Sequence, residues 1–158
     1  MSLKHRHGIN VWHLILKRSF DELSLNDLYS ILKLRSEIFV VEQCCVYQDM
    51  DNIDQECTHF YIKEKDEVIA YARILAPGLE YKEASLGRVV VKDTHRSKGL
   101  ASRLTEACLD ELSSKYPDSP IKIMAQVYLK EFYKKYGFKV ISDEFREDQL
   151  PHVYLLKS

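Results

Sequence analysis

Apolar residues recur along this 158-residue chain with two different periods, and the changes between them predict the order of its elements. Runs rich in β-branched and aromatic residues favour strands, whereas apolar residues spaced three and four apart favour one face of a helix. Residues 43–58 follow neither period, which predicts a loop or a broken helix. The expected order is β-α-β-β-β-α-β-α-β-β, with strands at 11–17, 58–65, 68–75, 86–91, 121–127, 138–141 and 152–156 and helices at 24–40, 100–112 and 129–136.

The middle of the chain combines a strand, a short polar loop and a helix. Residues 89–91 are three consecutive valines, which favour extended backbone. The loop after them carries Arg96, Lys98 and Gly99, and the amphipathic helix begins directly afterwards. A helix N-terminus offers free backbone N–H groups and partial positive charge, so this geometry predicts a phosphate site. Because Gly99 lacks a Cβ, the backbone there can approach a phosphate oxygen closely.

Two motifs in this order resemble a known family. Residues 96–101, Arg-Ser-Lys-Gly-Leu-Ala, fit the pattern Arg/Gln-x-x-Gly-x-Gly/Ala, and residues 132–138 read Phe-Tyr-x-x-x-Gly-Phe after an intervening strand. Together they resemble the signatures of the GCN5-related N-acetyltransferases. Residues 34–43 and 147–152 are similar to the ElaA-like branch of that family, so the resemblance covers most of the chain. Neither a P-loop nor a dinucleotide-binding glycine motif is present.

The resemblance implies an α/β (α+β) fold, with a mixed, mostly antiparallel sheet flanked by helices, over residues 1–158 as a single N-acetyltransferase domain. It also implies acetyl-CoA as co-substrate. In the family, the strand at 89–91 splays away from the strand at 123–126, and the gap admits the pantetheine arm. The residues that the resemblance assigns to cofactor binding are Val89, Val90, Val91, Arg96, Ser97, Lys98, Gly99, Leu100, Ala101 and Ser102.

Acetyl transfer requires a proton donor for the departing thiolate and a base for the attacking amine. The motif match makes Tyr133 the candidate acid, although a tyrosine on an apolar helical stripe also suits a packed core. Glu42, His59 and His152 stand at ElaA-like positions and are the candidate bases. For each of these three, a hydrogen-bonded structural role is an equal alternative.

Composition excludes several other functions. The net charge of −1 disfavours nucleic-acid binding, and no apolar run is long enough to span a membrane. No signal-peptide pattern opens the chain, so we expect a cytoplasmic protein without a membrane partner. The four cysteines have no C-x-x-C spacing, which predicts reduced thiols and no metal site. A homodimer is one possible assembly.

The segment between Glu42 and Glu56 holds five acidic residues and no Lys or Arg. A cleft lined by one sign of charge concentrates the opposite sign, so we expect this segment to draw in a cationic primary amine, with a solvated acidic loop as the alternative. The leading functional hypothesis is transfer of acetyl from acetyl-CoA to a small-molecule primary amine. Acyl-homoserine lactone synthesis is a second enzymatic hypothesis. A non-catalytic acyl-CoA-binding or regulatory module is the hypothesis from a different class.

Overall fold

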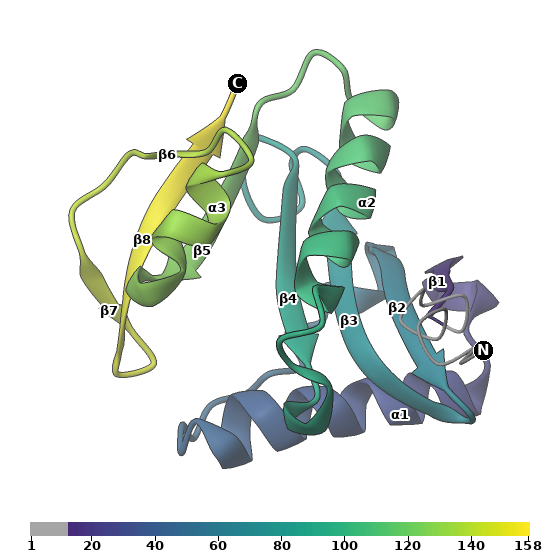
Figure 1. Cartoon of the computed structure of the whole chain (residues 1–158). Helices are drawn as coiled ribbons and strands as arrows, with labels where there is room; N and C mark the ends of the chain where they lie inside the picture. Colours follow the sequence, from purple (N-terminus) through teal and green to yellow (C-terminus); the bar gives the residue numbers. More distant parts are fainter. Residues whose placement is uncertain (1–12) are drawn as a thin grey trace, which may run out of the picture.

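The computed structural model describes residues 13–158, which form two sheets flanked by helices (Figure 1). The first sheet is antiparallel throughout and has the order β1-β2-β3-β4. Its strands are β1 (Ile15–Ser19), β2 (Thr58–Glu64), β3 (Glu67–Leu75) and β4 (Ser85–Val91). In the second sheet, β8 (Leu150–Lys157) pairs with β5 (Ile121–Gln126), β6 (Lys139–Val140) and β7 (Phe145–Glu147).

Two long helices cover opposite faces of the first sheet. Helix α1 (Leu25–Arg35) begins at Ser24, whose hydroxyl accepts the Asp27 N–H at 3.0 Å, and it continues without a break into the π-helical turn η3 (Ser36–Glu42). Tyr61 and Tyr71 pack with the apolar face of α1. Their neighbours along the strands point the other way, into a larger cluster with α2 (Leu100–Lys115) that also takes residues from the second sheet.

The remaining helical segments are short. The 3-10 turn η6 (Val127–Leu129) leads into α3 (Lys130–Lys134), which follows β5 directly. The other 3-10 turns are η2 (Phe20–Glu22), η4 (Asp54–Glu56) and η5 (Asp93–His95).

The predicted fold class and element order are confirmed, with three differences. The helix expected at 24–40 ends in a π-helical turn, and the strand β7 is additional. The first strand begins at Ile15, and the first two residues of its predicted range, 11–12, lie outside the described residues. β7 is only three residues long and has charged neighbours, so it gives no periodic signal.

The two sheets meet at one short junction and diverge beyond it (Figure 1). Ala84 and Ile121 form an isolated parallel bridge, in which the Lys122 N–H donates to the Ala84 carbonyl at 2.9 Å. Past this point the register between β3 and β4 shifts by one residue, and Arg88 has a φ of +53°. Such a bulge bends and twists a strand, so β4 turns away from β5 and a gap opens between them.

Candidate active site

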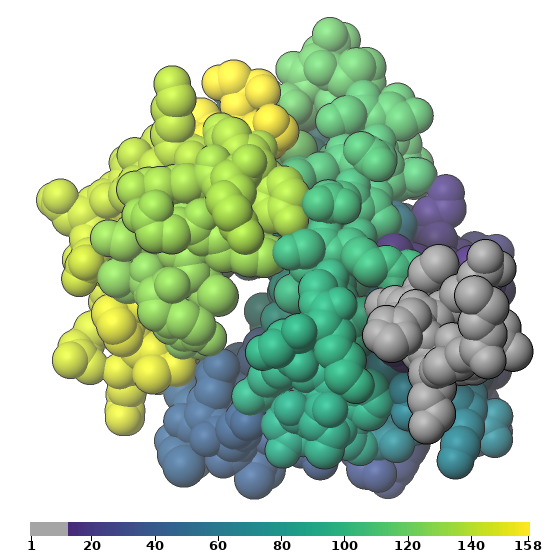
Figure 2. Space-filling model, in the orientation of Figure 1, coloured from purple at the N-terminus to yellow at the C-terminus, as the bar shows by residue number. Residues whose placement is uncertain are grey.

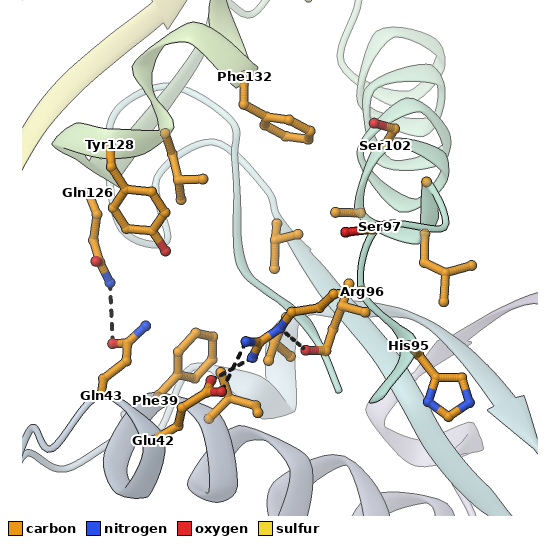
Figure 3. Close-up of a pocket in the computed structure, with 18 of the residues that line it drawn as sticks. Phe39, Glu42, Gln43, His95, Arg96, Ser97, Ser102, Gln126, Tyr128 and Phe132 are labelled. Carbon is orange, nitrogen blue, oxygen red and sulfur yellow. Dashed lines mark hydrogen bonds and ion pairs between the residues drawn. The ribbon is translucent and has the colours of Figure 1, made fainter. Parts of the chain in front are cut away.

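A cleft of about 600 Å³ occupies the gap between β4 and β5. It is visible in Figure 2 as the hollow where α3, the loop before α2 and η3 come together. Its walls come from three segments that are far apart in the sequence, residues 38–43, 89–102 and 126–133, and Figure 3 draws most of the lining residues. The lining residues are Ile38, Phe39, Glu42, Gln43, Val89, Val90, Val91, His95, Arg96, Ser97, Gly99, Leu100, Ala101, Ser102, Gln126, Tyr128, Leu129, Phe132 and Tyr133.

One end of this cleft is the glycine loop that precedes α2. Gly99 is the N-cap of the helix and has a φ of +76°, a left-handed conformation that costs an L-residue about 1–2 kcal/mol. A Cβ on Gly99 would meet no atom within 4 Å, so the backbone conformation accounts for the glycine and the space beside it stays open. The first turn of α2 has no acidic residue. These features suit an anionic group such as a pyrophosphate.

The structure places almost all the predicted cofactor residues along this one surface. Val89, Val90 and Val91 line the wall that β4 contributes, and residues 96–102 contribute the loop end. Lys98 is the exception, because it is exposed and does not line the cleft.

Arg96 and Glu42 face one another at this end of the cleft (Figure 3). Both terminal nitrogens of Arg96 donate to the Glu42 carboxylate, at 2.9 and 2.5 Å, and its Nε donates to the Val91 carbonyl at 3.2 Å. The hydrogen bond to Glu42 raises the pKa of Arg96 further. Both oxygens of the predicted base Glu42 are therefore engaged by a cation.

A second, smaller cleft of about 140 Å³ lies on the other side of the same gap. Residues of the β7–β8 hairpin and of the segment after η3 form its outer part. The Gln126 amide nitrogen donates to the Gln43 amide oxygen at 3.3 Å, across the boundary between the two clefts (Figure 3). The residues that line both clefts are Phe39, Gln43, Val89, Gln126, Leu129 and Tyr133. A molecule in one cleft can therefore meet a molecule in the other at this boundary.

Tyr133 lies at the boundary with only 6% of its surface exposed. Its ring packs edge-to-face against Phe132 and Phe138, with centroids 5.0 and 5.8 Å away. Burial raises the pKa of Tyr133 above its usual range, so the phenol keeps its proton at neutral pH. The side chain is thus a core residue that also lines both clefts and carries a protonated phenol.

The three candidate bases occupy different environments. His152 is buried and lines the second cleft, and its Nδ1 bonds to the Leu150 carbonyl at 2.8 Å. Because a carbonyl oxygen only accepts, a proton is assigned to Nδ1, and Nε2 makes no hydrogen bond within residues 13–158.

His59 is 1% exposed and lines neither cleft. Its Nδ1 is 2.6 Å from the Tyr71 hydroxyl, and its Nε2 is 2.9 Å from the Asp54 carbonyl. Burial lowers the pKa of His59, which keeps the ring neutral. Both nitrogens of His59 are engaged inside the protein, so the structure gives it a structural environment and does not bring it to either cleft.

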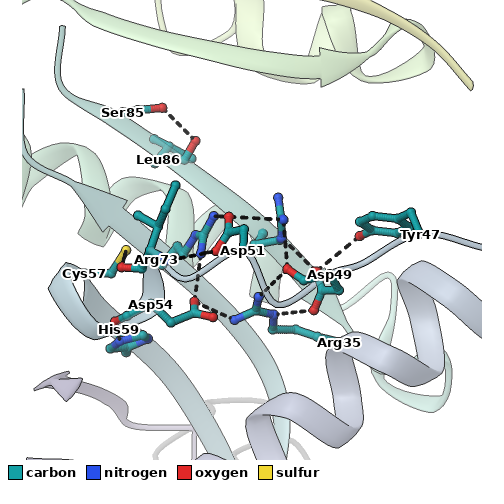
Figure 4. Close-up of polar contacts among 12 residues, drawn as sticks. Arg35, Tyr47, Asp49, Asp51, Asp54, Cys57, His59, Arg73, Ser85 and Leu86 are labelled. Carbon is teal, nitrogen blue, oxygen red and sulfur yellow. Dashed lines mark hydrogen bonds and ion pairs between the residues drawn. The ribbon is translucent and has the colours of Figure 1, made fainter. Parts of the chain in front are cut away.

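The prediction that residues 42–56 form an acidic steering surface is wrong, because the aspartates of this segment turn inward (Figure 4). Asp49 and Asp54 bind Arg35 at 2.9 and 2.7 Å, and Arg35 is fully buried. Asp54 and Asp51 also bind the buried Arg73, at 2.8 and 2.5 Å. Arg88 completes the network through Asp49 at 2.8 Å. Burial by itself raises the pKa of Asp54, but hydrogen bonds from Arg35 and Arg73 outweigh it and lower the pKa. The charges of the three aspartates in this network are therefore balanced by the three arginines.

Arg35 and Arg73 were missed as organising residues by the sequence analysis. The signal was a charge at an apolar position: Arg35 lies on the buried face of α1, and Arg73 lies within the buried run of β3. Within residues 13–158, His, Cys, Asp and Glu side chains form no group of three or more placed to hold a metal ion, and the four cysteines are free thiols. In the same range no helix has the length and apolar character needed to cross a bilayer.

Splayed central strands beside a helix-capping glycine loop define an acyl-CoA N-acyltransferase fold. The two clefts in the gap between these strands are consistent with this class of protein. The chain belongs to the GNAT acetyltransferase family, because the family model for the acetyltransferase (GNAT) domain matches residues 30–157. Members of this family use acyl-CoA as the acyl donor.

Individual relatives agree with this assignment. Protein ElaA of Escherichia coli is 37% identical over 134 residues, which is 84% of this chain and 88% of ElaA. Its crystal structure resembles this one with a TM-score of 0.85 and covers 92% of this chain and 99% of that one. An acyl-CoA N-acyltransferase from Pseudomonas aeruginosa has a TM-score of 0.87 at 32% identity, with coverage of 92% and 99%.

Proposed function

We propose that this protein transfers an acetyl group from acetyl-CoA to a primary amine by direct attack, with both substrates bound together. The observation that supports it most is the position of Tyr133 at the boundary of two clefts. One cleft ends at the glycine loop before α2, which suits a phosphate group, and the other contains His152, whose Nε2 makes no hydrogen bond within residues 13–158. A two-sided arrangement of this kind suits a reaction between two separately bound molecules.

The first cleft fits the donor. Backbone N–H groups between Ser97 and Ser102 would hold the pyrophosphate, with Arg96 adding charge. The edge of β4 that faces the gap would pair with the amides of the pantetheine arm, because β5 meets this edge only at the Ala84–Ile121 bridge within residues 13–158. When bound, acetyl-CoA supplies the activated thioester carbonyl.

The second cleft and its boundary supply the proton transfers. The ammonium form of the acceptor gives a proton to Nε2 of His152, and the lone pair freed on its nitrogen forms the new C–N bond at the acyl carbon. The C–S bond breaks with its electron pair on sulfur. Tyr133, which burial keeps protonated, donates its hydroxyl hydrogen to that sulfur, and its phenolate takes up the second proton that the nitrogen loses as the amide forms. The products are the amide and the free thiol of CoA.

The test measures release of the CoA thiol with a panel of primary amines and confirms the amide by mass. Amine-dependent thiol release is expected for the wild type. Tyr133→Phe should reduce kcat by ~10²–10⁴-fold, the usual worth of proton donation, while acetyl-CoA binding stays the same. The matched control is Tyr128→Phe, an exposed tyrosine that lines the first cleft alone and should retain activity. Binding of acetyl-CoA without release for any amine would favour the non-catalytic module instead.

A further inference from the structure

The second cleft is lined in part by a β-hairpin that carries two acidic residues, Glu147 and Asp148. β7 and β8 are joined by the two-residue loop Asp148–Gln149, in which both residues have positive φ. Two such residues match a tight hairpin turn whose twist suits the strands. The Cys45 thiol donates to the Asp148 carbonyl at 2.9 Å, so the tip is attached to the segment after η3. Glu147 and Asp148 line the cleft from this hairpin, and both are exposed.

The charges around this cleft are unequal. Arg88 is the cation among its lining residues, and it is already bound by Asp49 and Asp51. Glu147 and Asp148, by contrast, have no ion-pair partner among residues 13–158. Acidic residues alone would not define a site, because a solvated acidic turn is common. The second observation is His152, a ring more than nine-tenths buried, which lines the same cleft and has one nitrogen left available.

Strand register sets the spacing between the histidine and the nearer carboxylate. Phe145 is the cross-strand partner of His152, and Glu147 is two residues further along β7. His152 and Glu147 are therefore diagonal neighbours on one face of the sheet. The Cα atoms of such a pair are about 7–8 Å apart. A short methylene chain spans that distance. An amine whose reacting nitrogen lies at His152 can then place a second cationic group at Glu147.

We infer that the acceptor is a small diamine or an equivalent molecule with two cationic groups, in which Glu147 binds the ammonium that does not react. This inference rests on the proposed function and adds the class of acceptor. Glu147 selects the substrate through binding, whereas His152 takes the proton of the reacting amine. Asp148, next to Glu147 at the tip, contributes a second negative charge to the same end of the cleft.

The experiment compares kcat/KM for putrescine, aminobutanol and butylamine, which share a methylene chain and differ at the far end. The wild type should prefer putrescine by roughly tenfold to hundredfold, the worth of a hydrogen bond between charged groups. Glu147→Gln should bring this preference close to one through the KM of putrescine, with butylamine unaffected. High salt should weaken the preference of the wild type.

The matched control is Glu144→Gln. Glu144 is an exposed glutamate directly before β7, and it lines neither cleft. It should leave the preference intact. Equal kcat/KM for the three amines in the wild type, or the same loss in both variants, would overturn the diamine inference while leaving acetyl transfer to amines in place. If no amine stimulates thiol release, both the proposed function and this inference are overturned.

Discussion

Glu42 holds Arg96 through two parallel hydrogen bonds of 2.9 and 2.5 Å, which join the end of η3 to the loop before α2. Both side chains are about two-fifths exposed and both line the first cleft. A phosphate group at this loop would have to share Arg96 with the Glu42 carboxylate or displace it. We therefore expect the pair to compete with a bound polyanion for Arg96.

Glu42→Gln should tighten binding of CoA by about two- to fivefold, because an exposed ion pair of this kind is worth little and the variant loses one negative charge beside the phosphates. Calorimetry at low salt measures the change, and the difference should shrink at high salt. Glu37→Gln is the control, since Glu37 is an exposed acid on the same turn that lines neither cleft. Weaker CoA binding by Glu42→Gln would show that the pair supports the binding-competent loop.

Gly99→Ala should cost about 1–2 kcal/mol of stability from its positive φ and also reduce the stabilisation by CoA. For the wild type, ligand at about 100 times its Kd adds roughly 2.7 kcal/mol. Thermal unfolding with and without CoA separates the two effects. Gly78→Ala is the matched control, because Gly78 has a φ of +90°, has equally open space for a Cβ, and does not line the clefts. An equal CoA-induced shift in both variants would count against the phosphate loop.

The local pattern was sufficient to predict the loop and the elements around it. Gly99 lies between a run of consecutive β-branched residues and the start of a helical period, and that boundary needs no information from elsewhere in the chain. The buried ion pairs are different. Arg35 is paired with aspartates 14 and 19 residues away, and the pairing depends on how the segment after η3 folds back over the sheet. The five acidic residues spread over residues 42–56 give the same local sequence signal whether they face solvent or buried arginines.

The histidines show the same limit. His59 and His152 both lie on strands and are both buried. His59 faces Tyr71 on the neighbouring strand and the chain of η4, whereas His152 faces a gap that exists because β4 and β5 diverge. Distance between strands, which the sequence around each histidine does not encode, decides which of them can meet a substrate.

Arg35→Met should lower the free energy of unfolding at pH 7 by about 3–5 kcal/mol, because Asp49 and Asp54 would each lose one arginine partner and the network would keep three aspartates for two arginines. Hydrogen bonds from the arginines lower the folded pKa of Asp54 despite its burial, so their contribution is present above the ordinary aspartate value near 4 and lost as pH falls through the folded value. Urea unfolding should therefore show a difference between variant and wild type that shrinks below about pH 4.

Lys33→Met is the control for that measurement, since Lys33 is an exposed cation on the same helix. It should change stability by no more than about 0.5 kcal/mol. A similar small effect for Arg35→Met would mean that the network contributes no more than a surface pair.

His152→Asn should lower kcat by ~10²–10⁴-fold with little change in acetyl-CoA affinity, because it keeps a donor near the Leu150 carbonyl and removes the Nε2 lone pair. The rate of the variant should recover as pH approaches the amine pKa of about 10, where free amine no longer needs a base. His59→Asn provides the comparison: it should reduce stability through its lost contacts with Tyr71 and Asp54, and the folded fraction should keep its kcat. If His59→Asn lost activity without losing stability, or if His152→Asn turned over like the wild type at neutral pH, the base would have to be sought elsewhere, first at Glu42.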